Sequence, residues 1–313
     1  MVVTSCNGER FLGEQLRSIA GQTHLPDEVI VGDDASTDSS VEIAREVLGG
    51  LEADVRVVTS PSRLGLAANL ARCTELSTGD VVFFADQDDV WRPGKVAAFC
   101  DVFSRDSGAD LVFSNGKVID GSGHATGRTL WSLVGFGRSE QRQWRKSPVG
   151  VLSRRTVVTG ATMAVRRRLV RSAWPFPSRC LHDEWLTLCA ALRGPVPVAL
   201  PDLLVDYRLH GANLAGLPAQ GARERLVQAG WPREVTLEVW DDACSRFPGE
   251  ASAQLEAAIC FARRRPARTA AGLERALRVT ELGFAGDYRR YGQGWRGALH
   301  DLVAPALYGR GQG

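Results

Sequence analysis

Hydrophobic and polar positions follow two different periods along the first 110 residues. Apolar residues spaced three and four apart predict helices, over residues 11–20, 36–47, 66–76 and 91–105. Short apolar runs between them predict buried strands, at residues 2–3, 29–31, 55–58, 81–85 and 111–113. Ser36 or Thr37 is the expected N-cap of the second helix. This alternation predicts an α/β fold with a mostly parallel central sheet.

The remainder of the chain changes character twice. Five glycines make residues 120–150 loop-rich, and a strand or strand–turn is expected over 156–165. A helix over 181–192 and two short strands follow, at residues 196–200 and 203–205. From about residue 218 the pattern is helical, with helices expected over 250–265 and 267–282. The sequence therefore predicts a domain over residues 1–216 and a C-terminal helical extension over 217–313.

Composition narrows the class of protein. Of the 313 residues, 44% are hydrophobic and 24% are charged, as in ordinary globular proteins. The net charge of +2 argues against a nucleic-acid partner. Seven scattered cysteines without a C-x-x-C pair favour reduced thiols in the cytoplasm over disulfides or a zinc site.

The apolar runs also bear on membrane contact. None approaches the roughly 20 residues of a transmembrane helix, and we expect no signal peptide. Peripheral contact with the inner face of the membrane stays open. Because Met1 almost adjoins the first apolar residues, either the first strand is short or the natural start lies upstream.

Polar residues follow three of the predicted strands. They are the stretches Ser5–Asn7, Asp33–Asp34 and Asp86–Asp88. Ligands of parallel sheets lie beyond the carboxyl ends of the strands, so these three stretches are expected to converge on one edge.

The acidic run at residues 86–89 has two interpretations. Asp86 and Asp88 are spaced to hold one Mg²⁺ or Mn²⁺, which favour oxygen ligands completed by substrate phosphates. Alternatively, Asp88 or Asp89 caps the helix that follows. Asp89 is the better candidate for a cap of a helix beginning near Trp91.

Five stretches in this order resemble the inverting glycosyltransferases of family 2, above all bacterial rhamnosyltransferase-like members. The stretches are residues 5–12, 32–38, 86–91, 182–185 and 207–213. The resemblance implies the GT-A fold, with a nucleotide-sugar half over residues 1–110 and an acceptor half over 111–216.

The family also implies roles for residues at the sheet edge. It implies donor contacts from seven residues, namely Ser5, Asn7, Glu9, Asp34, Asn69, Asp86 and His210. Asp34 would accept a hydrogen bond from the nucleotide base, although an Asx turn is the alternative. Asn69 would equally suit a helix surface, and Cys6 replaces the aromatic residue usual in the family. Asp86 and Asp88 would hold the metal against the diphosphate, with Arg208 near His210.

Inversion by a single displacement requires one carboxylate on the acceptor side. The match at residues 182–185 implies Asp183 as this general base, with Glu184 as the fallback. From its position alone, Asp183 would equally serve as the N-cap of the helix over 181–192.

Basic residues crowd segment 128–155. They would form a solvated face or recognise a phosphate-bearing acceptor such as a lipid-linked saccharide. Trp131 and Trp144 would suit a membrane interface or stacking on sugar.

The sequence as a whole predicts a metal-dependent transferase. It would move a hexose, or a deoxyhexose such as rhamnose, from a nucleotide-diphosphate sugar to a hydroxyl of a saccharide or lipid-linked acceptor. A nucleotidyltransferase and a nucleotide-sugar-binding regulatory module are the alternatives. Against a nucleotidyltransferase, residues 7–10 do not form the Gly-rich basic turn that such enzymes use. A binding module would not account for the carboxylates of Asp86, Asp88 and Asp183. A dinucleotide-binding enzyme is disfavoured because no Gly-x-Gly-x-x-Gly follows the first strand.

Overall fold

The computed structural model describes residues 1–211, 234–266, 270, 272–292 and 294–308. The chain divides into two compact units, residues 1–137 with 157–214 and residues 138–156 with 215–313. Segment 138–156 thus groups with the C-terminal helices. The predicted boundary at 216/217 lies outside the described residues and stays a prediction.

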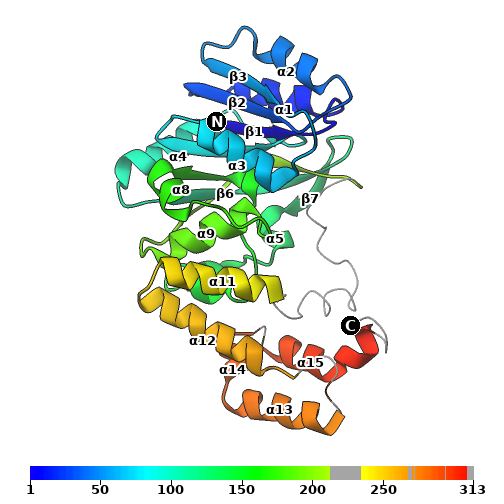
Figure 1. The fold of residues 1–313 in the computed structure, drawn as a ribbon, viewed down its shortest axis with the longest axis vertical. Helices are drawn as coiled ribbons and strands as arrows, with labels where there is room; N and C mark the ends of the chain where they lie inside the picture. Colours follow the sequence, from blue (N-terminus) through cyan, green and yellow to red (C-terminus); the bar gives the residue numbers. More distant parts are fainter. Residues whose placement is uncertain (212–233, 267–269, 271, 293, 309–313) are drawn as a thin grey trace. The chain divides into compact units, whose positions relative to one another are not determined.

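The first unit is an α/β domain, as predicted (Figure 1). Its strands are β1 (Val2–Ser5), β2 (Glu28–Asp33), β3 (Asp54–Thr59), β4 (Val81–Asp86), β5 (Val90–Trp91), β6 (Leu111–Asp120), β7 (Ala125–Thr129), β8 (Met163–Arg166) and β9 (Val198–Leu209). Its helices are α1 (Leu12–Ala20), α2 (Ser40–Leu48), α3 (Leu66–Leu76), α4 (Lys95–Arg105), α5 (Leu130–Leu133), the 3₁₀ turn η1 (Gly160–Thr162), α8 (Arg167–Ala173) and α9 (His182–Leu192).

One mixed sheet runs through this unit, in the order β3-β2-β1-β4-β8-β6-β9-β5, with β7 paired to β6. The four strands from β3 to β4 are parallel, whereas β8 is antiparallel to both β4 and β6. β6 and β9 are parallel to each other. The parallel half has one carboxyl edge, so the loops after β1, β2 and β4 open on the same side.

Both faces of the parallel half are buried, which explains its continuous apolar strands. Val3 and Val31 contribute to a core that also contains Leu12, Leu16 and Ile19 of α1. Val2 and Ile30 are buried as well, as is Leu70 of α3. The predicted apolar face of the first helix is confirmed.

Two predicted helix starts are wrong. Helix α2 begins at Ser40 with Ser39 as N-cap, not Ser36 or Thr37, and Asp38 accepts the backbone N–H of Ser40 instead (3.1 Å). Helix α4 begins at Lys95, because Val90 and Trp91 pair with β9 as the short strand β5.

Two short strands were expected over 196–205, but the structure has the single strand β9. It pairs with β6, and the register shifts between Ser114↔Leu200 and Asn115↔Leu203. This shift skips Pro201, which has no N–H to donate, and Asp202, and a second shift after Asn115 skips Leu204. The proline that separated the apolar runs in the sequence therefore marks a bulge within one strand.

Residues 120–150 are more regular than predicted. β7 and α5 belong to the first unit, and α6 (Arg138–Trp144) and α7 (Pro148–Leu152) to the second. A reciprocal capping box of Thr129 and Ser132 starts α5, and Ser147 caps α7 with Pro148 behind it. The strand expected over 156–165 is shorter, since η1 precedes β8.

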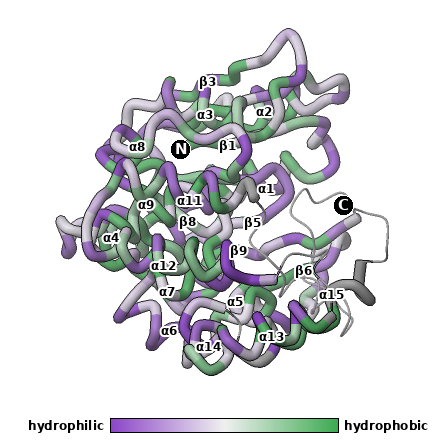
Figure 2. Tube along the Cα trace, turned by 60° about the horizontal axis from the view of Figure 1, so that its bottom comes forward, coloured by the Kyte–Doolittle hydropathy of each residue, from purple (hydrophilic) through white to green (hydrophobic). Residues whose placement is uncertain are grey.

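The second unit is helical, as expected. Its other helices are α11 (Glu234–Arg246), α12 (Glu250–Arg264), α13 (Gly272–Phe284), α14 (Asp287–Arg290) and α15 (Trp295–Tyr308). The expected helical pattern at residues 218–233 lies outside the described residues. In Figure 2 hydrophobic and hydrophilic positions alternate along α12 and α13, as in amphipathic helices. Across the described residues, none of the helices has the length and hydropathy of a membrane span.

Gly32 of β2 provides the first testable prediction. A Cβ there would lie 2.3 Å from Cys73 Sγ and 2.8 Å from Asn69 Oδ1, so α3 packs directly on the strand backbone. We expect Gly32→Ala to lower the free energy of unfolding by about 1–3 kcal/mol, measured by urea denaturation.

Two further variants test the cause. A Cβ at Gly50 meets nothing within 4 Å, so Gly50→Ala should change stability little. Adding Cys73→Ala to Gly32→Ala should restore part of the lost free energy of unfolding, because removing the sulfur makes room for the new Cβ. The effects of the two substitutions should therefore not add. Strict additivity of the two substitutions would contradict the packing explanation.

Candidate active site

The polar residues predicted to converge do share one edge of the sheet. Strand register aligns Thr4 with Asp86, and Ser5 with Asp33. The turns after β1, β2 and β4 therefore begin at the same level.

Gln87 joins the first and third of these turns. Its Oε1 accepts the backbone N–H of Cys6 at 2.8 Å and the hydroxyl of Ser5 at 3.2 Å. A Cβ at Gly8 would lie 2.5 Å from the same Gln87 oxygen, so any other residue there would displace the Gln87 side chain. Ser5 thus lies at the edge as predicted, held by a residue that the sequence did not single out.

Asn7 and Glu9 lie in the turn after β1 and contact the turn after β2. Asn7 has a positive φ of 50°, which asparagine tolerates well, and its Oδ1 accepts the N–H of Thr37 at 2.9 Å. Glu9 Oε2 accepts the N–H of Ser39 at 3.2 Å. Both side chains are exposed at the edge and fasten the two turns together.

Asp34 is buried, and its carboxylate accepts two backbone N–H groups, from Leu64 at 2.6 Å and Gly65 at 2.9 Å. It therefore fixes the start of α3. Its neighbour Asp33 binds the N–H of Ser36 through Oδ2, while the buried Oδ1 has no hydrogen-bond partner within the described residues. The sequence predicted a donor contact for Asp34 but not for Asp33.

Asn69 lies beneath the edge. It is 1% exposed, so its placement on a helix surface is wrong. Its Nδ2 donates to Gly32 O at 2.7 Å, and its Oδ1 accepts from Arg72 at 3.1 Å. These bonds hold α3 against β2, and a donor contact by Asn69 stays a prediction.

Asp86 ends β4 among other carboxylates. Burial, followed by the charges of Asp88 and Asp183, raises the pKa of Asp86 to about 7. Asp88 Oδ2 lies 2.9 Å from Nε2 of His210. His210, which was predicted to contact the donor, therefore contacts Asp88, which was predicted to bind the metal. The two carboxylates and the imidazole form one polar group at the end of β4.

Asp89 has a different role from the predicted helix cap, and that prediction is wrong. It is buried, and its Oδ1 accepts the backbone N–H of Arg208 in β9 at 2.9 Å. Its Oδ2 has no partner in the part of the chain that the structure describes. Burial and the charges of Asp88 and Asp86 raise the pKa of Asp89 well above its usual range.

Two buried cations face these acids. Arg208 donates to the backbone O of Asp88 at 2.7 Å and to Glu14 at 2.6 Å. Lys95 is fully buried, with Nζ 3.3 Å from the Trp91 ring centroid and a hydrogen bond to Ala161 O. Burial lowers the pKa of Lys95 well below its usual range, although Asp89 and Asp86 oppose this.

The sequence does contain a signal for the burial of Lys95. Lys95 occupies the inward positions of α4 together with Phe99 and Phe103. A lysine on the apolar face of a helix, just after an acidic run, indicates a buried counter-charge.

Asp183 lies in the first turn of α9, whose N-cap is Leu181, so the capping alternative is wrong. Its Oδ2 accepts the N–H of Gly160 at 2.9 Å, and its Oδ1 that of Glu184 at 2.8 Å. Burial raises the pKa of Asp183. Glu184, the fallback, is exposed whereas Asp183 is 9% exposed.

His182 is an unpredicted feature beside Asp183. Its ring is buried against Phe84, with centroids 4.9 Å apart, and neither ring nitrogen has a hydrogen-bond partner among the described residues. Burial lowers the pKa of His182 to about 3, so the ring is neutral at ordinary pH.

The aromatic residues of the basic segment are not at a surface. Trp131 is 6% exposed and packs on Phe113 and Phe136, and Trp144 is 1% exposed. An interfacial role for either is wrong. The basic side chains themselves are exposed at Arg128, Arg138, Arg142, Arg145 and Lys146.

The residues at the end of β4 suit a hard divalent cation. Within the described residues no three or more Asp, Glu, His or Cys side chains are grouped as metal ligands. Asp86 and Asp88 nevertheless offer carboxylate oxygens in a region of excess negative charge, and Mg²⁺ sites are commonly completed by substrate phosphates.

Known proteins match this chain along most of its length. A family model described as Glycosyl transferase family 2 matches residues 1–172. The dTDP-rhamnosyl transferase RfbG of Shigella flexneri is 32% identical over 246 residues, which cover 74% of this chain and 81% of that protein.

Solved structures share the fold. TarS residues 1–349 of S. aureus, in complex with UDP-GlcNAc, superposes with a TM-score of 0.60 at 17% identity, covering 98% of this chain and 90% of that one. Mannosyltransferase PcManGT of Pyrobaculum calidifontis, in complex with GDP-Man and Mn²⁺, gives a TM-score of 0.55 at 19% identity, covering 98% and 85%. The predicted GT-A glycosyltransferase fold is confirmed, and the chain belongs to glycosyl transferase family 2.

Proposed function

We propose that the chain is a metal-dependent, inverting transferase of a hexose or deoxyhexose from a nucleotide-diphosphate sugar. The acceptor is a hydroxyl of a saccharide or of a lipid-linked saccharide. The observation that carries this proposal is the buried carboxylate of Asp183. It accepts the N–H of Gly160, and its charge contributes to the raised pKa of Asp86.

The donor lies at the carboxyl edge of the parallel half-sheet. Asp33 or Asp34 faces the base, the turn of Ser5, Asn7 and Glu9 borders the nucleoside, and His210 faces the diphosphate. The buried Oδ1 of Asp33 supports this arrangement, because a buried acceptor without a partner costs about 1–3 kcal/mol until a ligand donates to it.

Asp86 and Asp88 would hold Mg²⁺ or Mn²⁺ at the end of β4. Bound there, the metal offsets the charge that develops on the leaving group. PcManGT, which shares the fold, binds GDP-Man together with Mn²⁺, and this supports the same pairing here.

Asp183 acts as general base. It takes the proton of the acceptor hydroxyl while that oxygen bonds to the anomeric carbon from the face opposite the leaving group. The bond from that carbon to the diphosphate breaks, and the nucleoside diphosphate leaves with the electron pair. The burial that raises the pKa of Asp183 makes it a stronger base than an exposed aspartate.

Rhamnose is the proposed deoxyhexose because RfbG, named a dTDP-rhamnosyl transferase, matches 74% of this chain. The exposed basic side chains of segment 128–155 support an acceptor that carries phosphate. A donor screen with dTDP-rhamnose, UDP-GlcNAc and GDP-mannose tests the sugar. Donor binding without transfer to any saccharide acceptor would instead support a regulatory binding module.

The metal role predicts that EDTA abolishes nucleoside diphosphate release and that excess Mn²⁺ restores it. Asp88→Asn should raise the Mn²⁺ concentration needed for half-maximal activity by at least about tenfold, because a charged ligand is lost. Asp101→Asn on the exposed face of α4 is the matched control. Full turnover in EDTA would exclude the metal role while leaving transfer intact.

The base role predicts that Asp183→Asn lowers kcat by about 10²–10⁴-fold while donor affinity changes little. Glu184→Gln, one residue along the same helix, should retain near wild-type turnover. Donor affinity is measured by calorimetry and kcat by product release. The opposite pattern, with loss only in Glu184→Gln, would move the base role to Glu184.

The pH profile gives an independent test. A base works deprotonated, so activity should fall as pH is lowered through the pKa of Asp183. Because burial raises that pKa, the fall should begin above the ordinary aspartate value of about 3.9. A profile of kcat that stays level down to that value would contradict a buried base.

A further inference from the structure

The first unit has a pocket at the edge of the sheet opposite the carboxylates. Thr74, Glu75, Ser77 and Thr78 line it from the end of α3, and Arg167, Val170, Arg171 and Trp174 from α8 and just beyond. Val81 at the start of β4 pairs with Arg166 at the end of β8, so both linings meet at the amino end of β4. Five residues of strand, roughly 17 Å at about 3.3 Å each, separate Val81 from Asp86.

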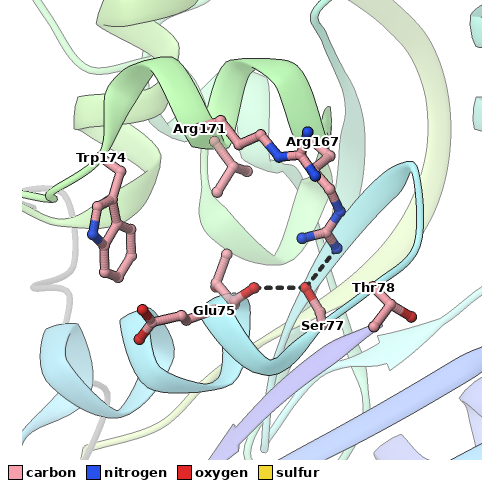
Figure 3. Close-up of a pocket in the computed structure, with 8 residues that line it drawn as sticks. Glu75, Ser77, Thr78, Arg167, Arg171 and Trp174 are labelled. Atoms are coloured by element: carbon pink, nitrogen blue, oxygen red, sulfur yellow. Dashed lines mark hydrogen bonds between the residues drawn. The ribbon is translucent and has the colours of Figure 1, made fainter.

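The pocket has the size of a small-molecule site. Its volume is about 480 Å³, within the roughly 300–1,000 Å³ usual for such sites. Figure 3 shows Trp174 and Glu75 at one end and the side chains of Arg167 and Arg171 at the other.

The arginine end carries two guanidinium groups that form no ion pair within the described residues. Arg167 is half-buried and donates from Nε to Gly79 O at 2.7 Å and from Nη2 to Ser77 Oγ at 2.9 Å. These bonds fix its guanidinium and leave three of its five N–H groups without an acceptor in the described structure. Arg171 forms neither an ion pair nor a hydrogen bond with any described residue.

Two arginines four residues apart on one helix repel each other. The third arginine of α8, Arg168, shows the usual solution, an ion pair with Asp110. Arg167 and Arg171 form no such ion pair with a described carboxylate, Glu75 at the far end of the pocket included, although the charges of Glu28 and Asp80 act on Arg167. Two guanidinium groups at one end of a pocket, of which Arg167 is fixed by its hydrogen bonds, match a phosphate, which can accept from both.

The other end suits a sugar ring. The Trp174 indole packs on Phe176 with centroids 5.2 Å apart and remains 37% exposed toward solvent and the pocket. An amphipathic aromatic surface beside a carboxylate acceptor offers a face for a pyranose and a partner for its hydroxyls.

We propose that this pocket binds a hexose phosphate. The phosphate lies between Arg167 and Arg171, the ring lies against Trp174, and a hydroxyl donates to Glu75. It is a second ligand site, separated from the donor site by the length of β4. It stands independently of the transferase proposal, since neither its residues nor its charge take part in transfer.

Calorimetry of the full chain tests the site, with UDP and Mn²⁺ present in excess to fill the donor site. Glucose 1-phosphate should bind with a Kd of about 0.1–1 mM. Inorganic phosphate and methyl glucoside, which each carry half of the recognised chemistry, should bind at least about tenfold more weakly. Absence of binding at 10 mM, or binding only when UDP is omitted, would overturn the proposal.

Arg171→Gln is the decisive variant, because Arg171 holds no other residue in place. It should weaken glucose 1-phosphate binding by about tenfold or more, whereas Arg45→Gln at an exposed position of α2 should leave it unchanged. Glu75→Ala should remove the preference for glucose 1-phosphate over inorganic phosphate. Equal affinity of Arg171→Gln and wild type, or a loss of unfolding free energy without a loss of affinity, would assign the arginines a structural role only.

The same chemistry occurs in the headgroup of phosphatidylinositol, a phosphate beside a hydroxylated ring. Co-sedimentation with vesicles of phosphatidylinositol in phosphatidylcholine distinguishes this source. Binding that Arg171→Gln abolishes, with no affinity for glucose 1-phosphate, would place the ligand on a lipid and overturn the soluble ligand proposed here.

Discussion

Repulsion among carboxylates at the end of β4 is the constraint on which the site depends. After burial, which is the larger cause, the charges of Asp88 and Asp183 raise the pKa of Asp86, and those of Asp88 and Asp86 raise the pKa of Asp89. Removing such groups from water is costly unless opposite charges accompany them. The chain places Lys95 and Arg208 beside them, and both cations are buried, which strengthens the electrostatic interaction relative to one at the surface.

Arg208 also explains why the antiparallel half of the sheet is needed. It comes from β9, near the far edge of the sheet order, and bonds Asp88 O, Asp89 Oδ1 and Glu14. His210 follows directly after this strand and contacts Asp88 and the ring of Phe11. Strand β9 thus carries to the end of β4 both a counter-charge and an imidazole, and the bulge at Pro201–Asp202 adjusts its register on the way.

The parallel half of the fold was predictable because its signals are local. Each strand and helix up to α3 shows its own period, and the carboxyl edge follows from their order alone. The same reasoning placed Asp86 and Asp88 at that edge, whereas Asp183 was named through the family resemblance. For Asn69 it left a helix surface open as one alternative, because only the packing between α3 and β2 decides which side chain fills the space above Gly32.

The features that the sequence did not predict depend on pairing between residues far apart in the chain. Trp91 was assigned to a helix, yet it pairs with Val205, 114 residues later, because a two-residue strand has no period of its own. The burial of Trp131 likewise depends on tertiary packing, against Phe113 and Phe136, that no local period shows. The sequence predicted candidate residues at the ends of strands. It did not predict Gln87 and Lys95, whose role is to hold or face other residues of the site.

Gln87 has a consequence for the order of folding. One amide oxygen holds the turn after β1, across 81 and 82 residues of chain. The turn that carries Ser5 and Asn7 therefore lacks this bond until β4 has joined β1. Contacts between such distant residues form late, because a long loop must close first. The surface proposed to face the nucleotide is consequently a product of the completed domain and not of its N-terminal strand–helix units.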